Sequence, residues 1–109
     1  MELTDKIRRV YLPMTETGFY ILFCLQTPQH GYGISQQVRR MTGGTLTISA
    51  GTMYGTLSKM ERDGLIAFQR EEENRKLYGL TALGQEVLAL ELKRIERLYR
   101  NSKGESMDE

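Results

Sequence analysis

Apolar residues recur at helical spacing in five segments of the chain, and proline or glycine interrupts the pattern between them. Side chains three and four residues apart lie on one face of a helix and can be buried together. Pro13 ends the first segment, because proline cannot continue a helix interior. Gly43, Gly44 and Gly64 follow two of the later ones. The pattern predicts helices over residues 2–12, 15–26, 34–41, 50–62 and 81–100.

The first residues of these segments are suited to capping helices. Serine and threonine side chains accept hydrogen bonds from the free amides of a first turn. We expect Thr15 or Thr17, Ser49 and Thr81 to do so, with Ser35 at the start of the 34–41 helix.

Alternating residues predict a small amount of β-structure. Residues 45–48 alternate and are β-branched, which is typical of a short strand. Residues 65–71 and 75–80 also alternate and are separated by the turn-like 72–74, which predicts a β-hairpin.

The order of these elements predicts a mainly α fold with a small β-wing, namely a winged helix-turn-helix followed by a C-terminal dimerisation helix. We expect a winged-helix domain over residues 1–80, with 2–12 as a helical extension. Residues 81–100 would form the dimerisation helix and 101–109 a flexible tail. The principal use of this arrangement is to place the second helix of the pair in the DNA major groove, with the hairpin on the flanking backbone.

Composition narrows the function classes. Of 109 residues, 39% are hydrophobic and 27% charged, as in an average soluble domain, and the net charge is only +1. The distribution of charge is more informative, because residues 31–60 contain three cations and no carboxylate. A single cysteine, Cys24, excludes an intrachain disulfide and a multi-cysteine metal site. No apolar run is long enough for a membrane span, so we expect a cytoplasmic protein without a membrane partner.

The helix predicted over 50–62 has a face suited to a DNA groove. This face carries short hydroxyls, a glycine and one cation, with no acid before Glu61. Such groups can donate hydrogen bonds to phosphates or base edges, although a merely solvated helix face remains the alternative. Ser49 would place phosphate-binding amides at the helix start. The residues expected to contact DNA here are Ser49, Thr52, Tyr54, Thr56 and Lys59.

The tip of the predicted hairpin carries two adjacent cations, Arg75 and Lys76, after Asn74. Cations on a protruding loop suit contact with the DNA backbone. The run 71–73 is acidic, so we expect these acids to lie on the side away from DNA.

The last helix has an apolar face wider than one small domain can cover. A second copy of the chain would bury it, whereas folding back on its own core is the alternative. The residues expected at this dimer interface are Val87, Leu88, Leu92, Ile95 and Tyr99.

Enzymatic functions find little support in the sequence. His30 and Cys24 are each the only residue of their type, so they form no metal cluster unaided. His30 is predicted in a turn, as a surface or capping histidine. We therefore expect no catalytic residues, no metal and no cofactor.

Three stretches of the chain form one further pattern: HGYGISQQV at 30–38, GGTLTISAGTMYGTLSKMERDGLI at 43–66 and RKLYGLTALG at 75–84. Together, in this order and spacing, they resemble the PadR family of transcriptional regulators. Residues 49–54 correspond to the family's Ser-Pro-Gly-Thr-Leu-Tyr motif, with Ala50 in place of proline. Arg75 and Lys76 match its basic wing.

The resemblance implies a homodimer that binds double-stranded DNA at an inverted repeat, most often as a repressor. It also implies a small aromatic effector as a partner in some members. Two other functions are kept open at this point: a protein-interaction adaptor that has lost DNA binding, and a ligand-binding protein that uses the dimer cleft.

Overall fold

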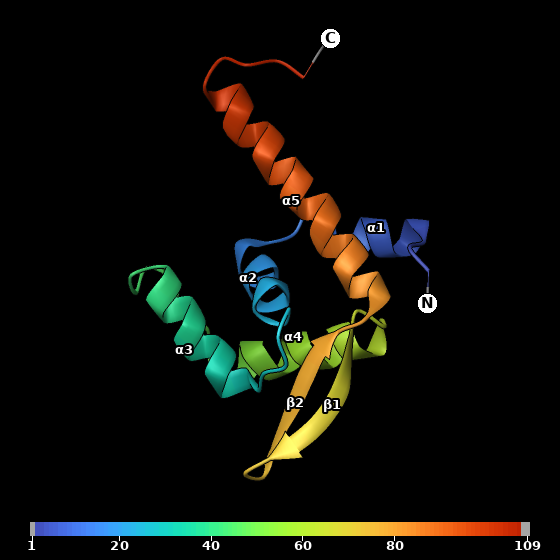
Figure 1. The fold of residues 1–109 in the computed structure, drawn as a ribbon, viewed down its shortest axis with the longest axis vertical. Coiled ribbons are helices and arrows are strands. Elements are labelled where there is room, and N and C mark those ends of the chain that lie inside the picture. Colours follow the sequence, from blue (N-terminus) through green and yellow to red (C-terminus); the bar gives the residue numbers. More distant parts are fainter. Residues whose placement is uncertain (1, 108–109) are drawn as a thin grey trace.

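The computed structural model describes residues 2–107 and consists of five helices and one antiparallel hairpin in that part of the chain (Figure 1). Three helices pack around the hairpin end of the molecule, while the last helix runs away from it towards the opposite end. The elements in chain order are α1 (Asp5–Tyr11), α2 (Glu16–Cys24), α3 (Gly31–Met41), α4 (Ala50–Arg62), β1 (Ile66–Glu72), β2 (Arg75–Leu80) and α5 (Ala82–Ser102).

A side chain caps the start of every helix. The expected caps Thr15, Ser49 and Thr81 are confirmed, each accepting from the amide three residues later. The expected start of α3 is wrong, because that helix begins at Gly31 rather than near Ser35. The reason is His30, whose Nδ1 accepts a hydrogen bond from the Gly33 amide at 2.9 Å and so caps the helix earlier.

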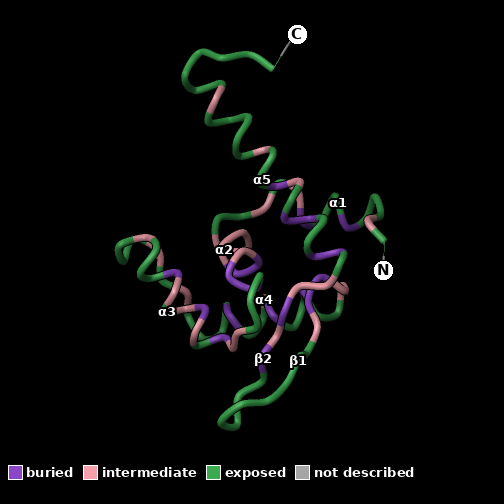
Figure 2. The backbone as a smooth tube through the Cα atoms, in the orientation of Figure 1, coloured by how far each residue is buried: buried purple, intermediate pink, exposed green. Residues whose placement is uncertain are grey.

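The core lies where α2, α3, α4 and the first half of α5 meet (Figure 2). α4 contributes Met53, Leu57 and Met60, which are spaced at four and three residues and are all buried. Burying each such side chain stabilises the fold by about 1.5–3 kcal/mol before entropy costs. This buried face fixes which side of α4 is left to solvent.

The strand expected over residues 45–48 is absent; this segment has no regular secondary structure. Gly43 and Gly44 turn the chain with φ of +59° and +82°. Leu46 and Ile48 pack against the core, which accounts for the alternation without any strand partner. The free edge of β2 is occupied instead by Gln29, which exchanges two backbone hydrogen bonds with Tyr78 at 3.0 and 2.9 Å.

The predicted hairpin is confirmed, and we call β1 and β2 together the wing. Its tip is a two-residue turn at Glu73 and Asn74, with φ of +50° and +64°. Two consecutive residues with positive φ suit the right-handed twist of a tight hairpin. The register shifts between Phe68 and Arg70, as expected for a β-bulge.

α5 runs to Ser102, two residues into the segment expected to be a flexible tail. Residues 108–109 of that tail, like residue 1, lie outside the described part of the chain. The buried residues of α5 end at Glu91, so its second half extends beyond the core. Figure 2 shows this half as exposed.

Glu91 joins α5 to the segment between α1 and α2. Its carboxylate is 1% exposed and accepts from Arg94 at 2.6 and 2.8 Å and from the Met14 amide at 2.9 Å. The Arg94 guanidinium lowers the pKa of Glu91, overcoming the opposing effect of burial. The first half of α5 is thereby fixed to the segment that joins α1 and α2.

Candidate nucleic-acid interface

The start of α4 is exposed and has unoccupied amides. The Ser49 hydroxyl accepts from the Thr52 amide at 3.2 Å and lies 3.0 Å from the Thr52 hydroxyl. The first turn of α4 carries no acid. The partial positive charge of a helix N-terminus is therefore open to an anion.

The outward surface of α4 is partly bare backbone. Gly51 and Gly55 lie opposite the buried methionines, and an added Cβ at either position would meet no atom within 4 Å. Tyr54 is 64% exposed beside them. A convex helix with so little side-chain bulk can approach another surface closely.

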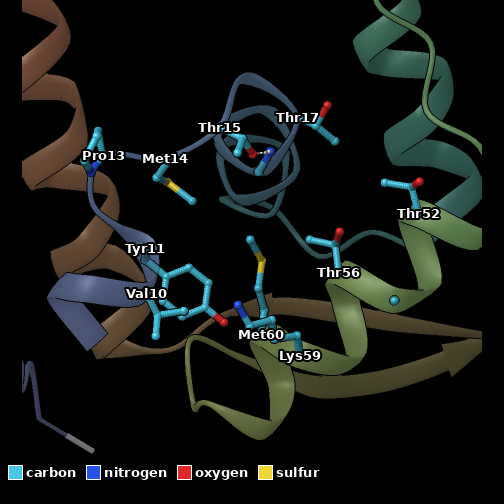
Figure 3. A pocket seen from close by; sticks show the side chains of 12 residues that line it. Val10, Tyr11, Pro13, Met14, Thr15, Thr17, Thr52, Thr56, Lys59 and Met60 are labelled. Atoms are coloured by element: carbon cyan, nitrogen blue, oxygen red, sulfur yellow. Dashed lines mark hydrogen bonds between the residues drawn. The ribbon is translucent and has the colours of Figure 1, made fainter. Parts of the chain in front are cut away.

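One flank of α4 lines a groove, the α2-side groove, with a volume of about 430 Å³ (Figure 3). The expected contacts Thr52, Thr56 and Lys59 all lie here, opposite the start of α2. The Lys59 ammonium is 5.1 Å from the centre of the Tyr11 ring, whose hydroxyl donates to Asp63 at 2.7 Å. Burial and the bond to Asp63 raise the pKa of Tyr11. The groove is lined by Val10, Tyr11, Pro13, Met14, Thr15, Thr17, Gly18, Thr52, Gly55, Thr56, Lys59 and Met60.

The opposite flank of α4 faces the wing across a second hollow, the wing-side cleft, of about 530 Å³. Arg75 projects from β2 and stacks on the Tyr32 ring, with its guanidinium carbon 5.1 Å from the ring centre. The imidazole of His30 stacks with the same Tyr32 ring at an interplanar angle of 13°. The cleft is lined by His30, Gly31, Tyr32, Tyr54, Leu57, Ser58, Asn74, Arg75, Lys76 and Tyr78.

The expectation that the wing's acids lie on the side away from DNA is wrong, because the consecutive strand residues Glu71 and Glu72 lie on opposite faces of the hairpin. In the register of the hairpin, Glu72 lies directly opposite Arg75, and Glu71 lies directly opposite Lys76. Directly opposed residues share a face of the hairpin, so each face carries one acid and one cation. Arg70 offsets part of this charge, because its Nε lies 3.0 Å from the Glu72 carboxylate.

The five residues expected at the dimer interface fall into two groups. Val87 and Leu88 are 0% and 3% exposed and belong to the core of their own chain. Leu92, Ile95 and Tyr99 are 40%, 37% and 59% exposed on the free half of α5. Folding back, the alternative considered from sequence, therefore accounts for the first half of the helix.

The family of the chain follows from comparison with known proteins. The model of the transcriptional regulator PadR-like family matches residues 21–90, which include α3, α4 and the wing. This chain belongs to the PadR-like family. Family and fold are those of transcriptional regulators, and the winged helix predicted from sequence is confirmed.

A curated relative is similar to the chain in sequence, and solved structures are similar to it in fold. The transcriptional regulator YqjI of Escherichia coli K12 is 30% identical over 74 residues, which are 68% of this chain and 36% of YqjI. A transcriptional regulator from Clostridium thermocellum superposes with a TM-score of 0.68 at 23% identity, covering 95% of this chain and all of the other. Bacillus subtilis PadR, solved with operator DNA, gives a TM-score of 0.62 at 25% identity over 72% of this chain and 47% of that one.

Sequence reasoning missed part of the surface that this PadR-like chain presents. Ser58, Tyr32 and His30 line the wing-side cleft but were not expected at an interface. The HGYG motif was the available signal, since a histidine directly before a helix can cap it. Among residues 2–107, we find neither a helix suited to crossing a membrane nor a cluster of three potential metal ligands.

Proposed function

We propose that this PadR-like regulator binds double-stranded DNA as a homodimer, recognises an inverted repeat, and represses transcription from it. The observation that carries the proposal is the surface of α4. The outward surface of α4 has little side-chain bulk and no acid in its first turn. It lies between the α2-side groove, which contains Lys59, and the wing-side cleft, which contains Arg75 and Lys76. The Bacillus subtilis PadR structure with operator DNA supports the same use of the fold.

In this proposal α4 enters the major groove. Gly51 and Gly55 allow its backbone to approach the bases, while Ser49 and the free amides of the first turn bind a phosphate. Thr52 and Thr56 donate hydrogen bonds on the α2 side of the helix, and Tyr54 donates one on the wing side.

Cations on both flanks would hold the two backbone strands that border the groove. Lys59 lies on the α2 side, and Arg75 and Lys76 lie on the wing. Each phosphate neutralised releases a counterion, so affinity is expected to fall steeply with salt.

The free half of α5 is the proposed dimer contact. Leu92, Ile95 and Tyr99 are spaced at three and four residues, the spacing of a two-helix seam. Leu98 adds a further exposed apolar side chain there. A second copy would bury the seam and place two α4 helices about 34 Å apart, one turn of DNA.

The first experiment is selection of binding sites from a random DNA library at two salt concentrations. An enriched inverted repeat whose binding weakens with salt is the expected result. Lys59→Gln should then reduce the slope of log K against log salt by about 0.9, with Lys93→Gln on α5 as the matched control. A folded protein that enriches no sequence would instead favour the adaptor function or the ligand-binding function.

The dimer is tested separately by sedimentation. Ile95→Glu places a charge in the seam and should yield a folded monomer, because Ile95 lies outside the core. Arg97→Glu, on the polar side of the same helix, should leave the dimer intact. A dimer that survives Ile95→Glu would contradict the assigned seam.

A small-molecule effector forms the last part of the proposal, and the α2-side groove is a candidate site for it. Met14 and Met60 form an apolar floor, with Lys59 and Thr56 beside it. An amphipathic carboxylate, aromatic or aliphatic, would bind Lys59, which we also assign to DNA, and would therefore compete with DNA for this residue. Titration with benzoate and octanoate, each against its neutral amide, should reveal binding that Met14→Gln weakens and Met41→Gln does not.

A further inference from the structure

Two hydrogen-bond donors converge at the edge of the wing-side cleft. Nε2 of His30 lies 3.4 Å from Nη1 of Arg75, although the two residues are 45 positions apart in the chain. An arginine nitrogen can only donate. The nature of this contact therefore depends on which nitrogen of His30 carries the proton.

The cap of α3 decides that question. Nδ1 of His30 accepts the Gly33 amide hydrogen at 2.9 Å, so Nδ1 holds no proton. A neutral imidazole must then carry its hydrogen on Nε2. Nε2 and the guanidinium are consequently both donors, and they do not bond to each other.

Neighbouring side chains hold this pair in place. Tyr32 contacts both members, stacking with the imidazole at a centroid distance of 6.4 Å and lying under the guanidinium at 5.1 Å. The Tyr32 hydroxyl accepts from Gln36 at 2.9 Å, which fixes the ring. Two acids, Glu72 and Glu73, line a hollow together with His30 and Arg75. The Glu72 carboxylate accepts a hydrogen bond from Arg70 at 3.0 Å, and neither acid is bonded to His30 or Arg75. The two donors are therefore preorganised with no acceptor shared between them.

We propose that His30 and Arg75 together bind one phosphate oxygen of the nucleic-acid backbone. A single oxygen placed between two donors 3.4 Å apart can accept from both, and a charged acceptor makes such bonds stronger. The site lies between α4 and the wing, where a strand bordering the groove would pass. This inference rests on the proposed function but assigns a contact to a residue outside the predicted set.

The tautomer can be tested without DNA. His30 is the only histidine of the chain, so its imidazole gives a single set of signals in a ¹H–¹⁵N long-range correlation spectrum. The expected tautomer of the neutral imidazole carries its proton on Nε2, because Nδ1 accepts from the Gly33 amide. The opposite tautomer, with its proton on Nδ1, would overturn the proposal. Addition of a DNA duplex should then shift the Nε2 signal, and an unchanged signal in a saturated complex would also overturn it.

Variants separate the bridging role from the capping role. His30→Asn retains a good helix cap but cannot reach the phosphate. It should weaken binding to operator and random duplexes alike by about threefold to tenfold, without changing the salt slope, because a neutral donor displaces no counterion. Arg75→Gln should weaken binding and also reduce the slope by about 0.9, whereas the control Arg97→Gln, at an exposed position of α5, should change the affinity little.

The combination of both substitutions provides the final test. If the two residues share one phosphate, the double variant should lose much less affinity than the product of the two single losses. Strictly multiplicative losses, or full affinity for His30→Asn, would refute the shared site. Failure of the unmodified protein to bind any duplex would instead refute the proposed function, which keeps the two failures distinguishable.

Discussion

The buried carboxylate of Glu91 gives a prediction that can be worked through in detail. Glu91→Ala removes two hydrogen bonds from Arg94 and leaves the Met14 amide without its partner. Hydrogen bonds to a charged group contribute about 1.5–3 kcal/mol, and an amide left unsatisfied costs about 1 kcal/mol or more. Arg94 is 30% exposed and can regain water, which offsets part of the loss. We expect Glu91→Ala to lower the free energy of unfolding by about 3 kcal/mol.

The pH dependence follows from the direction of the pKa shift. The fold lowers the pKa of Glu91, so the folded state favours the carboxylate relative to the unfolded chain. This contribution is complete well above the unfolded-state pKa of about 4.3 and is lost as the pH falls through the lower folded-state value. The difference in stability between the natural chain and Glu91→Ala should therefore be constant near pH 7 and shrink below about pH 4.

Urea unfolding followed by circular dichroism between pH 3 and pH 7 measures both effects. Glu86→Ala is the matched control, because Glu86 is exposed on the same helix. The loss of stability caused by Glu91→Gln should lie between those caused by Glu91→Ala and Glu86→Ala, because an amide oxygen can still accept from the Met14 amide. A cost for Glu91→Ala equal to that of Glu86→Ala, or one that does not change with pH, would refute the role assigned to this carboxylate.

Three further predictions concern single residues. Gly84→Ala should lower the free energy of unfolding by about 1–3 kcal/mol, and the melting temperature with it. The added Cβ would press on the backbone of Leu65, whose carbonyl carbon would lie 3.0 Å away. Gly51→Ala, which meets no atom, should not lower it, and equal effects of the two would disprove this packing argument. Burial raises the pKa of the Cys24 thiol to about 11, so an aromatic disulfide reagent at pH 8 should label it only as fast as the chain opens; rapid labelling of the native protein would contradict this burial. Tyr11→Phe should lower the free energy of unfolding by about 1 kcal/mol in a urea titration, through loss of the bond to Asp63, and an unchanged midpoint would argue against that bond.

Local signals in the sequence were sufficient to predict α4 and the residues on its surface. Ser49 accounts for the start of the helix, Gly64 follows its end, and the apolar spacing between them identifies the buried face. All of these interactions act within a few residues of one another. The helix and the position of Thr52, Thr56 and Lys59 on one flank could therefore be predicted.

Interactions between distant segments limited the rest of the prediction. Residues 45–48 have the alternation of a strand, but Gln29 occupies the edge of β2 that such a strand would need. The contact between His30 and Arg75 joins residues 45 positions apart, so no local pattern records it. In α5 the apolar stripe is continuous in the sequence, and only the fold shows that the core covers Val87 and Leu88 and stops before Leu92.

The position along α5 at which its buried residues end also has a consequence for control of the regulator. Because the last buried residue of α5 is Glu91, the core formed by the other helices and the first half of α5 is complete without a second chain. Folding and pairing are then separate equilibria, and the proposed seam obeys mass action. Below the dissociation constant of the dimer, the population of paired molecules rises with the square of the protein concentration. The amount of regulator in the cell would thus act as an input signal, with occupancy of a two-half-site operator responding more steeply than the abundance of the protein itself.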